Sequence, residues 1–288
     1  MLNNGTPSIS GFGLADGKLA AIPDSTRPLS SADADPAQVL FTPGGTVLIV
    51  TERGTDTISS YLIDERGHAQ GPTTIRSSGQ TPYGFGLTAD GSLIVSEAFG
   101  GAAGAAAASS YAVSGAGELT MMSGSVGDTR SEVCWVALTK DDRFAYVTNF
   151  GDATVSSYEI TADRRLTLRD PVAASAGQGE KGIRDEAISG DGRYLYVIHP
   201  DAQKLFGWAV GQGGPAHASR RVRRGARHGG RTGGQLIQQA RARPGSSSRG
   251  NRLSRAACPA ADTDEANAHG QRARTRRPHA RDTPARRH

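Results

Sequence analysis

The sequence predicts an all-β fold built from four-stranded antiparallel units that recur about every 50 residues. A short segment ending in an aromatic residue occurs five times, at spacings of 49, 50, 47 and 50 residues. A tight-turn motif such as Leu138-Thr139-Lys140-Asp141-Asp142 precedes four of these segments, and a β-branched or aromatic run follows each turn. The recurring aromatic residues are Phe12, Tyr61, Tyr111, Tyr158 and Trp208.

Within one unit, from 36 to about 78, the pattern predicts four strands in order. The innermost strand covers Gln38 to Phe41, the second Val47 to Glu52, the third Thr57 to Ile63 and the outermost Thr73 to Arg76. Four short antiparallel strands at this period are typical of a β-propeller blade, whose faces pack on neighbouring blades. A β-sandwich would not require so regular a period.

The predicted propeller occupies residues 1–210 and is incomplete, with about four to five blades represented. Its repeat units cover about 8–29, 36–78, 82–128, 131–178 and 183–210. The first unit supplies only two outer strands and the last only three. Such a ring leaves unpaired strand edges and apolar blade faces, so we expect self-association through exposed blade edges.

The last segment, 211–288, differs sharply in composition from the rest of the 288-residue chain. It holds 18 of the chain's 33 Lys and Arg residues, all of them Arg, but only 4 of its 28 acidic residues. It contains none of the chain's aromatic residues. With so little apolar surface to bury, this Arg-rich tail is expected to be disordered.

The origin of the tail has three interpretations. Arg, Ala, Gly, Pro and His without Lys are typical of out-of-frame translation of a GC-rich gene, and we favour a frameshifted tail. A polyanion-binding arm and an ordinary disordered extension are the alternatives. The tail lacks the Lys and interleaved aromatic residues of a nucleic-acid arm, so nucleic acid is not the expected partner.

Several classes of protein are excluded on simple grounds. No run approaches the roughly 18 apolar residues of a membrane span, so no membrane partner is expected. The N-terminus has no signal-peptide pattern, which as written predicts a cytoplasmic protein; an export signal on a lost N-terminal portion would instead make it extracytoplasmic. No two of His68, His199, Asp185 and Glu97 have a ligand-like spacing, so we expect neither a metal nor a cofactor.

Three segments carry a resemblance to a known family: Pro36–Phe41 with Gly45, Val50–Tyr61, and Tyr146–Gly151 with Ser157-Tyr158. They are similar to the lactonase family of seven-bladed β-propellers, which includes 6-phosphogluconolactonase-like and carboxymuconate-cyclase-like proteins. The similarity covers roughly residues 3–210. Because members of that family have about seven such units, the resemblance implies a truncated ring.

The candidate site is the channel mouth, where the loops between second and third strands meet the loops entering the first strands. The resemblance gives Arg53 the task of holding an anion or polarising a lactone carbonyl, although Thr55 and Ala37 stand where many members carry histidine. The alternative for Arg53 is a loop arginine paired with Glu52 or Asp56. Glu97 is the candidate general base, or else a structural carboxylate.

The expected ligand-binding residues are Glu52, Arg53, Tyr83, Phe99, Asn149 and His199, with Glu132, Arg184 and Asp201 nearby. We expect a truncated, non-catalytic platform that binds a small anionic or sugar-derived ligand, such as a lactone, or a protein. The alternative is an active lactone hydrolase or cyclase, similar to 6-phosphogluconolactonase, in which Arg53 and Glu97 are catalytic.

Overall fold

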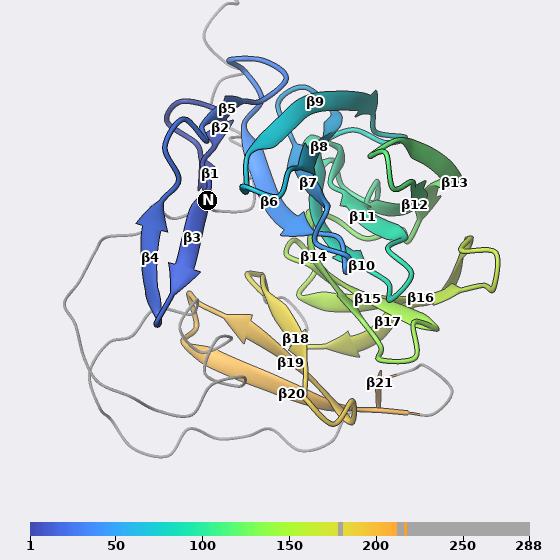
Figure 1. Ribbon diagram of the computed structural model, residues 1–288. Helices are drawn as coiled ribbons and strands as arrows, with labels where there is room; N and C mark the ends of the chain where they lie inside the picture. Colours follow the sequence, from blue (N-terminus) through green and yellow to red (C-terminus); the bar gives the residue numbers. More distant parts are fainter. Residues whose placement is uncertain (178–180, 212–215, 218–288) are drawn as a thin grey trace, which may run out of the picture.

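The structure, a computed structural model, describes residues 1–177, 181–211 and 216–217. Strands account for almost all of its regular structure, and a 3-10 turn, η1 (Phe99–Gly101), is the one helical element in the described part of the chain. The strands form five successive antiparallel sheets and one separate hairpin (Figure 1). The all-β fold class with four-stranded antiparallel sheets is therefore confirmed.

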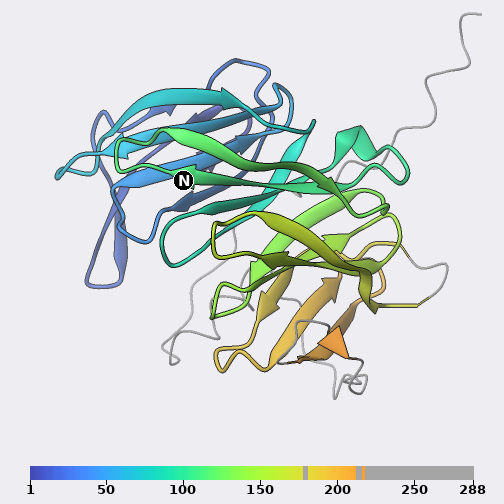
Figure 2. The ribbon, with the colours of Figure 1, turned by 90° about the vertical axis from the view of Figure 1, so that its right-hand side faces the viewer.

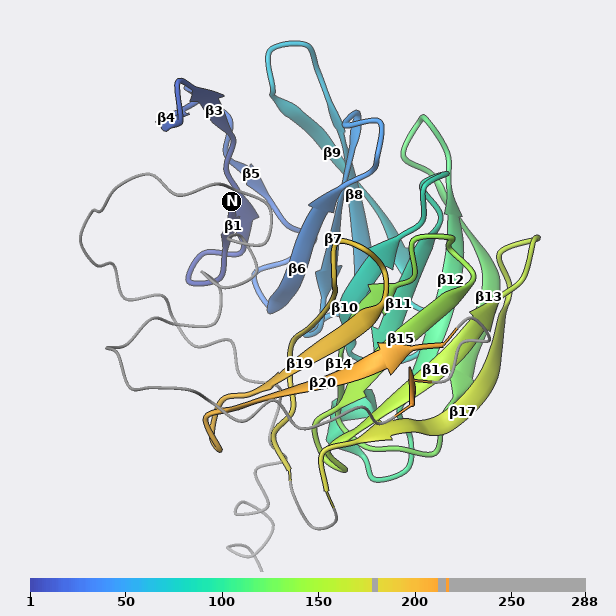
Figure 3. The ribbon, with the colours of Figure 1, turned by 90° about the horizontal axis from the view of Figure 1, so that it is seen from below.

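We number the sheets as blades. Blade 1 contains β1 (Leu2–Asn3), β2 (Ser8–Ile9) and β5 (Arg27–Pro28), and blade 2 contains β6 (Pro36–Phe41), β7 (Val47–Glu52), β8 (Thr57–Ile63) and β9 (Ala69–Arg76). Blade 3 contains β10 (Pro82–Leu87), β11 (Leu93–Glu97), β12 (Ala107–Val113) and β13 (Leu119–Gly127), and blade 4 contains β14 (Val133–Leu138), β15 (Phe144–Asn149), β16 (Thr154–Ile160) and β17 (Leu166–Ser175). Blade 5 contains β18 (Glu186–Ile188), β19 (Tyr194–His199), β20 (Lys204–Val210) and β21 (Ala216–His217). The separate hairpin consists of β3 (Phe12–Ala15) and β4 (Lys18–Ala21). Seen from below, the first strands β6, β10 and β14 lie inside and the last strands β9, β13 and β17 lie at the rim (Figure 3).

In each four-stranded blade, the tight turn that the sequence predicts joins the first strand to the second. In blade 4, Thr139 accepts a backbone hydrogen bond from Asp142 (3.0 Å), while its hydroxyl donates to the Asp141 carboxylate (2.6 Å). Asp142 has a φ of 55°, and glycine takes the same place in the other three turns with φ between 72° and 87°. Glycine and aspartate are the residues that adopt this left-handed conformation at low cost, which explains the recurring motif.

The core consists of apolar layers between neighbouring blades (Figure 2). Because side chains alternate along a strand, Val47 and Ile49 of β7 pack against blade 3, while Leu48 and Val50 pack against blade 1. Each fully buried side chain of this size contributes about 1.5–3 kcal/mol. A run of apolar residues in the second strand is therefore what joins one blade to two neighbours.

A repeated hydrogen bond fixes how successive blades dock. The penultimate residue of the second strand donates its hydroxyl to a carbonyl in the first-strand segment of the next blade. These bonds run from Thr51 to Tyr83 (2.6 Å), from Ser96 to Cys134 (2.6 Å) and from Thr148 to Arg184 (2.5 Å). They hold the segments that carry the mouth residues in a constant position relative to the preceding blade.

The N-terminal segment differs from the prediction of two outer strands in residues 8–29. β1 pairs with β2, and β2 pairs with β5, so blade 1 contributes three short strands. Between β2 and β5 the chain makes the additional hairpin β3–β4, because Asp16 and Gly17 both have positive φ and close a tight turn. Phe12, aligned with Tyr61 by its spacing, belongs to this hairpin and is exposed.

Two further predictions concern the C-terminal tail and membrane-spanning segments. Apart from residues 211 and 216–217, the Arg-rich tail at 211–288 lies outside the described residues. In the part of the chain that is described, no helix has the length and hydrophobicity required to span a bilayer.

Candidate functional site at the propeller mouth

The mouth lies at the end of the blades where first strands begin and second strands finish. In blades 2 and 4 the residue before the first strand, Asp35 or Glu132, has a positive φ of 40° or 56°. Its carbonyl accepts a hydrogen bond from the amide after the neighbouring second strand, Arg53 (3.1 Å) or Phe150 (2.9 Å). This repeated contact places Arg53 and Phe150 at equivalent positions around the mouth.

Arg53 lies between an acidic group and an aromatic ring. Its Nη2 donates to the Asp35 carboxylate at 2.6 Å, and its Cζ lies 5.1 Å from the centroid of the Tyr83 ring. The Arg53 side chain is 13% exposed, whereas that of Asp35 is 49% exposed. The described partner of Arg53 is therefore Asp35, from the loop entering blade 2, and not the Glu52 or Asp56 considered from the sequence.

Arg184 repeats this arrangement from blade 5. Its Cζ lies 5.2 Å from the Phe150 ring centroid, and its Nη2 lies 3.3 Å from the carboxylate of Asp201. The Arg184 side chain is 21% exposed and that of Asp201 is 66% exposed. Its Nε is buried and has no hydrogen-bond partner. Arg184 therefore retains a buried donor for which the described residues supply no acceptor.

Tyr83 interacts with both arginines. Burial raises the pKa of the Tyr83 phenol, while the cations of Arg53 and Arg184 act in the opposite direction. The Tyr83 ring meets that of Trp135 edge-on at 5.2 Å between centroids. These two rings form an apolar floor together with Ala37, Cys134 and Phe150. Two guanidinium groups consequently lie over one aromatic surface.

Hydrogen bonds hold the carboxyl groups of Glu52 and Glu97 inside the protein. Glu97 is fully buried, and its carboxyl accepts hydrogen bonds from the Gly79 amide (2.8 Å) and from three serine hydroxyls. The serines are Ser77 (3.1 Å), Ser109 (2.5 Å) and Ser125 (2.6 Å). Glu52 is held in the same way by the amide and hydroxyl of Ser30, by Thr55 (3.2 Å) and by Ser59 (2.5 Å).

Asn149 and His199 occupy the same position in blades 4 and 5. The Asn149 amide donates to Ser156 (2.8 Å) and Thr154 (3.3 Å). His199 is buried beside the Phe206 ring, with 6.5 Å between centroids, and its Nδ1 accepts from the Ala202 amide (3.2 Å). Three of the predicted ligand-binding residues, Glu52, Asn149 and His199, and the candidate base Glu97 thus end their second strands and turn toward their own third strands.

Phe99 begins η1 and lies over the backbone of Gly79, where an added Cβ would meet the Phe99 ring at 2.7 Å and the Glu97 carboxyl still closer. The predicted residues therefore divide into two groups. Arg53 and Tyr83 come together with Arg184, whereas Glu52, Glu97, Phe99, Asn149 and His199 line the interiors and closing loops of separate blades.

Sequence analysis did not single out Trp135 or Asp35 for the mouth, and it named Ala37 only as a departure from the family's histidine. The mouth position could have been found from the register of the first strands, in which four residues are equivalent from blade to blade: Ala37, Tyr83, Cys134 and Arg184. Alignment on third-strand aromatics and turn motifs does not reveal this position, since a β-bulge interrupts the first strand in blades 2, 3 and 4.

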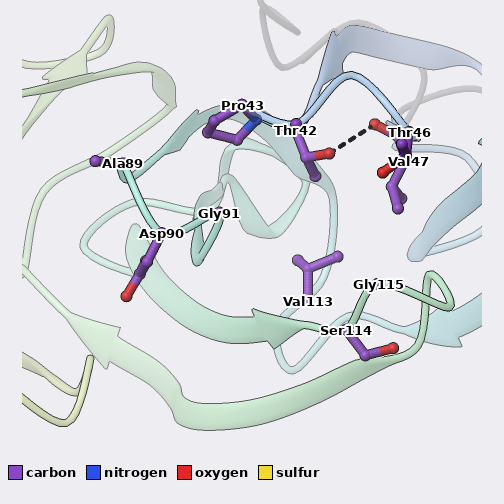
Figure 4. Close-up of a pocket in the computed structure, with 11 residues that line it drawn as sticks. Thr42, Pro43, Thr46, Val47, Ala89, Asp90, Gly91, Val113, Ser114 and Gly115 are labelled. Atoms are coloured by element: carbon purple, nitrogen blue, oxygen red, sulfur yellow. Dashed lines mark hydrogen bonds between the residues drawn. The ribbon is translucent and has the colours of Figure 1, made fainter.

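A shallow depression lies at the opposite end of blades 2 and 3, between their turns (Figure 4). It is lined by turn residues such as Pro43, Asp90 and Ser114, and it is open to solvent. The Thr42 hydroxyl donates to the Val47 carbonyl (3.2 Å) within this turn. In residues 1–177, 181–211 and 216–217, no three His, Cys, Asp or Glu side chains lie together as a metal site would require.

The model of a lactonase family, described as a seven-bladed β-propeller, matches residues 14–98 and 95–228. No curated protein matches the chain. Among solved structures, a protein from Lactobacillus plantarum superposes with a TM-score of 0.61 at 18% identity, covering 76% of this chain and 65% of that one.

Two other similar structures have informative descriptions. A putative 6-phosphogluconolactonase from Bacteroides uniformis has a TM-score of 0.56 at 18% identity, covering 73% of this chain and 63% of that one. A periplasmic gluconolactonase from Pseudomonas aeruginosa has a TM-score of 0.57 at 20% identity, covering 75% and 63%.

At these identities the structures show the fold alone, and the chain spans less than two thirds of their length. The family model, by contrast, matches well over half of the chain, in the same region that forms the repeated blades. The chain therefore belongs to the lactonase family of seven-bladed β-propellers.

Proposed function

We propose that the mouth binds a small anionic, sugar-derived ligand through Arg53 and Arg184, as a platform that does not hydrolyse lactones. The observation that carries this proposal is the pair of largely buried guanidinium groups over one aromatic floor. A guanidinium group binds a carboxylate or phosphate through two parallel hydrogen bonds and stays charged.

The acidic partners of the two arginines leave room for such a ligand. Asp35 and Asp201 are half-exposed and exposed, so water already competes for them. A phosphate or carboxylate that displaces Asp201 would also reach the Nε of Arg184, which has no acceptor in the described part of the chain. Because the guanidinium groups are shielded from solvent, the attraction for an anion is stronger there than in bulk water.

The ring of a sugar acid suits the floor between the arginines. Tyr83, Trp135 and Phe150 offer aromatic surface, on which the apolar face of a sugar can pack. The similar structures described as a gluconolactonase and a putative 6-phosphogluconolactonase are named for sugar lactones. A sugar acid or its lactone is therefore the ligand class that we propose for this chain.

The buried acids favour binding over catalysis. A general base needs a lone pair within reach of the water that it activates. Glu52 and Glu97 each accept four hydrogen bonds inside their own blades. These contacts support a structural role for both carboxyl groups.

One observation favours a lactone hydrolase as the second candidate function. Glu132 stands at the entrance to blade 4, with Oε1 3.6 Å from Lys181 Nζ and with Oε2 buried and without a hydrogen-bond partner among the described residues. An acid with an unused oxygen at the mouth has the chemistry of a general base, with Arg53 polarising the carbonyl.

Isothermal titration calorimetry with 6-phosphogluconate tests the binding proposal. Arg53→Ala and Arg184→Ala should each weaken binding by about 10- to 100-fold, since each removes a charge-assisted pair of hydrogen bonds. Arg164→Ala is the matched control, because Arg164 is 26% exposed and pairs with Asp90 at the opposite end of the blades. Equal affinities for all three variants and the unaltered protein would contradict the proposal.

A further inference from the structure

Blade 5 presents an apolar face on the side away from blade 4, and no strand of the described residues packs on it. Leu195 and Val197 of β19 belong to the core shared with blade 4. Alternation along the strand turns Tyr194, Tyr196 and Ile198 the other way. Their cross-strand partners on β20 are Ala209, Gly207 and Leu205, in that order. We call Tyr194, Tyr196, Ile198 and Leu205 the outer face.

The equivalent face of blade 4 is completely covered. Tyr146 and Val155 are both 0% exposed and belong to the core shared with blade 5, and Phe144, on the same side of β15, is 4% exposed. The corresponding residues of the outer face, Tyr194 and Leu205, are 37% and 43% exposed. The same kind of surface is therefore buried at one blade interface and left open at the next.

The outer face also lacks the polar contact that sets the register of the other blades. Thr51, Ser96 and Thr148 donate hydrogen bonds across the three preceding interfaces. Ile198 stands at the equivalent position of β19, since it pairs with Leu205 as Thr148 pairs with Val155. At this position, therefore, the outer face offers an apolar side chain where the other blades offer a hydroxyl.

A second bare apolar face lies on hairpin β3–β4. Its cross-strand pairs are Phe12 with Ala21 and Leu14 with Leu19, which places these four side chains on one side. All eight residues of the hairpin are exposed, Leu14 at 72% and Leu19 at 67%. The hairpin stands away from the sheets in Figures 1 and 2. An isolated two-stranded hairpin is only marginally stable in water, so it needs a surface to pack on.

We propose that the apolar side of hairpin β3–β4 packs on the outer face of blade 5 of a second copy of this chain. The contact continues the sheet-on-sheet packing already present between blades 4 and 5. Within one chain the two surfaces lie apart (Figures 2 and 3). A single hairpin is too small for a stable interface, which buries at least about 1,200 Å². A twofold dimer uses the contact twice and leaves no hairpin or outer face open.

Sedimentation equilibrium of the full chain tests this dimer. Leu14→Lys with Leu19→Lys, and separately Leu205→Lys, should each raise the dimer dissociation constant at least about 30-fold, because each places charges in both copies of an apolar contact. Met121→Lys is the control, since Met121 is also an exposed apolar residue, at 53%, but lies on β13. Circular dichroism verifies that each variant is folded.

The result that supports the proposal is dissociation of both the hairpin and the outer-face variants while Met121→Lys remains dimeric. A monomeric unaltered protein would overturn it. Dissociation of the outer-face variant alone would overturn it in favour of two outer faces packed on each other, and dissociation of the hairpin variant alone in favour of paired hairpins.

Discussion

Replacing Glu97 by alanine is expected to destabilise the protein by roughly 4 kcal/mol, because it leaves four buried donors without their acceptor. These donors are the Gly79 amide and the hydroxyls of Ser77, Ser109 and Ser125. They come from the loop before β10 and from β12 and β13, so one carboxyl joins three parts of blade 3. Urea denaturation, followed by tryptophan fluorescence, measures the change.

Two variants make this expectation specific. Glu97→Gln keeps an acceptor oxygen, and its amide can donate to a serine hydroxyl that turns to accept, so it should lose only about 1 kcal/mol. Glu118→Ala, in an exposed turn of the same blade, should change stability by less than about 0.5 kcal/mol. Equal stabilities for Glu97→Ala and Glu118→Ala would show that the buried contacts do not hold the blade.

Replacing Glu186 by valine is expected to stabilise the protein. Glu186 pairs with Val197 on the face of β18 that meets blade 4, and among the described residues neither of its carboxyl oxygens has a partner within hydrogen-bond geometry, although the backbone amides of Ala137 and Thr148 act to lower its pKa. The equivalent first-strand residues of blades 2 and 4 are Val39 and Val136. A buried polar group without a partner costs about 1–3 kcal/mol, which the valine removes.

The stabilisation should grow with pH. Burial raises the pKa of Glu186 well above its ordinary value of 4.5, and the neighbouring Asp185 raises it further. Tyr146, on blade 4, is the other titratable group that interacts with this carboxyl, and its own pKa is raised to about 12, mainly by burial. The folded state therefore holds the Glu186 proton more tightly than the unfolded state, so the unaltered protein loses stability as pH rises above 4.5 toward the raised pKa.

Denaturation at several pH values between 4 and 8 measures this difference. The stability gap between Glu186→Val and the unaltered protein should widen upward through this window, and Glu186→Gln should remove the pH dependence without the full gain. Glu65→Val, at an exposed site, is the control for the loss of one acidic residue. A gap that stays constant across this range would contradict a raised Glu186 pKa.

The blades could be predicted from the sequence because the turn residues and the apolar runs indicate the same structure. The turn at Thr139–Asp142 needs a positive φ and has Asp142 there, and the following run, Phe144–Asn149, is apolar on both sides because it packs between two blades. The additional hairpin at Phe12–Ala21 was not predicted, because the spacing between Phe12 and Tyr61 matches the spacing of the other recurring aromatic residues.

The candidate site could be predicted only in part. The loop position of Arg53 indicated the mouth, and the structure brings it to Tyr83. The hydrogen bonds of Glu97 could not be predicted, because its donors lie between 12 and 28 residues away along the chain. Arg184 was placed near the mouth by its loop, but its alignment with Tyr83 depends on first-strand register, which the bulges conceal.

Release of acid from 6-phosphogluconolactone at constant pH tests most directly whether the mouth is a binding platform. We expect the purified protein to bind 6-phosphogluconate but to release acid no faster than spontaneous hydrolysis, because four hydrogen bonds each hold the carboxyl groups of Glu52 and Glu97 in structural roles. Protein-dependent acid release that is lost in Arg53→Ala together with Glu97→Gln or Glu132→Gln would contradict the platform and identify a lactone hydrolase.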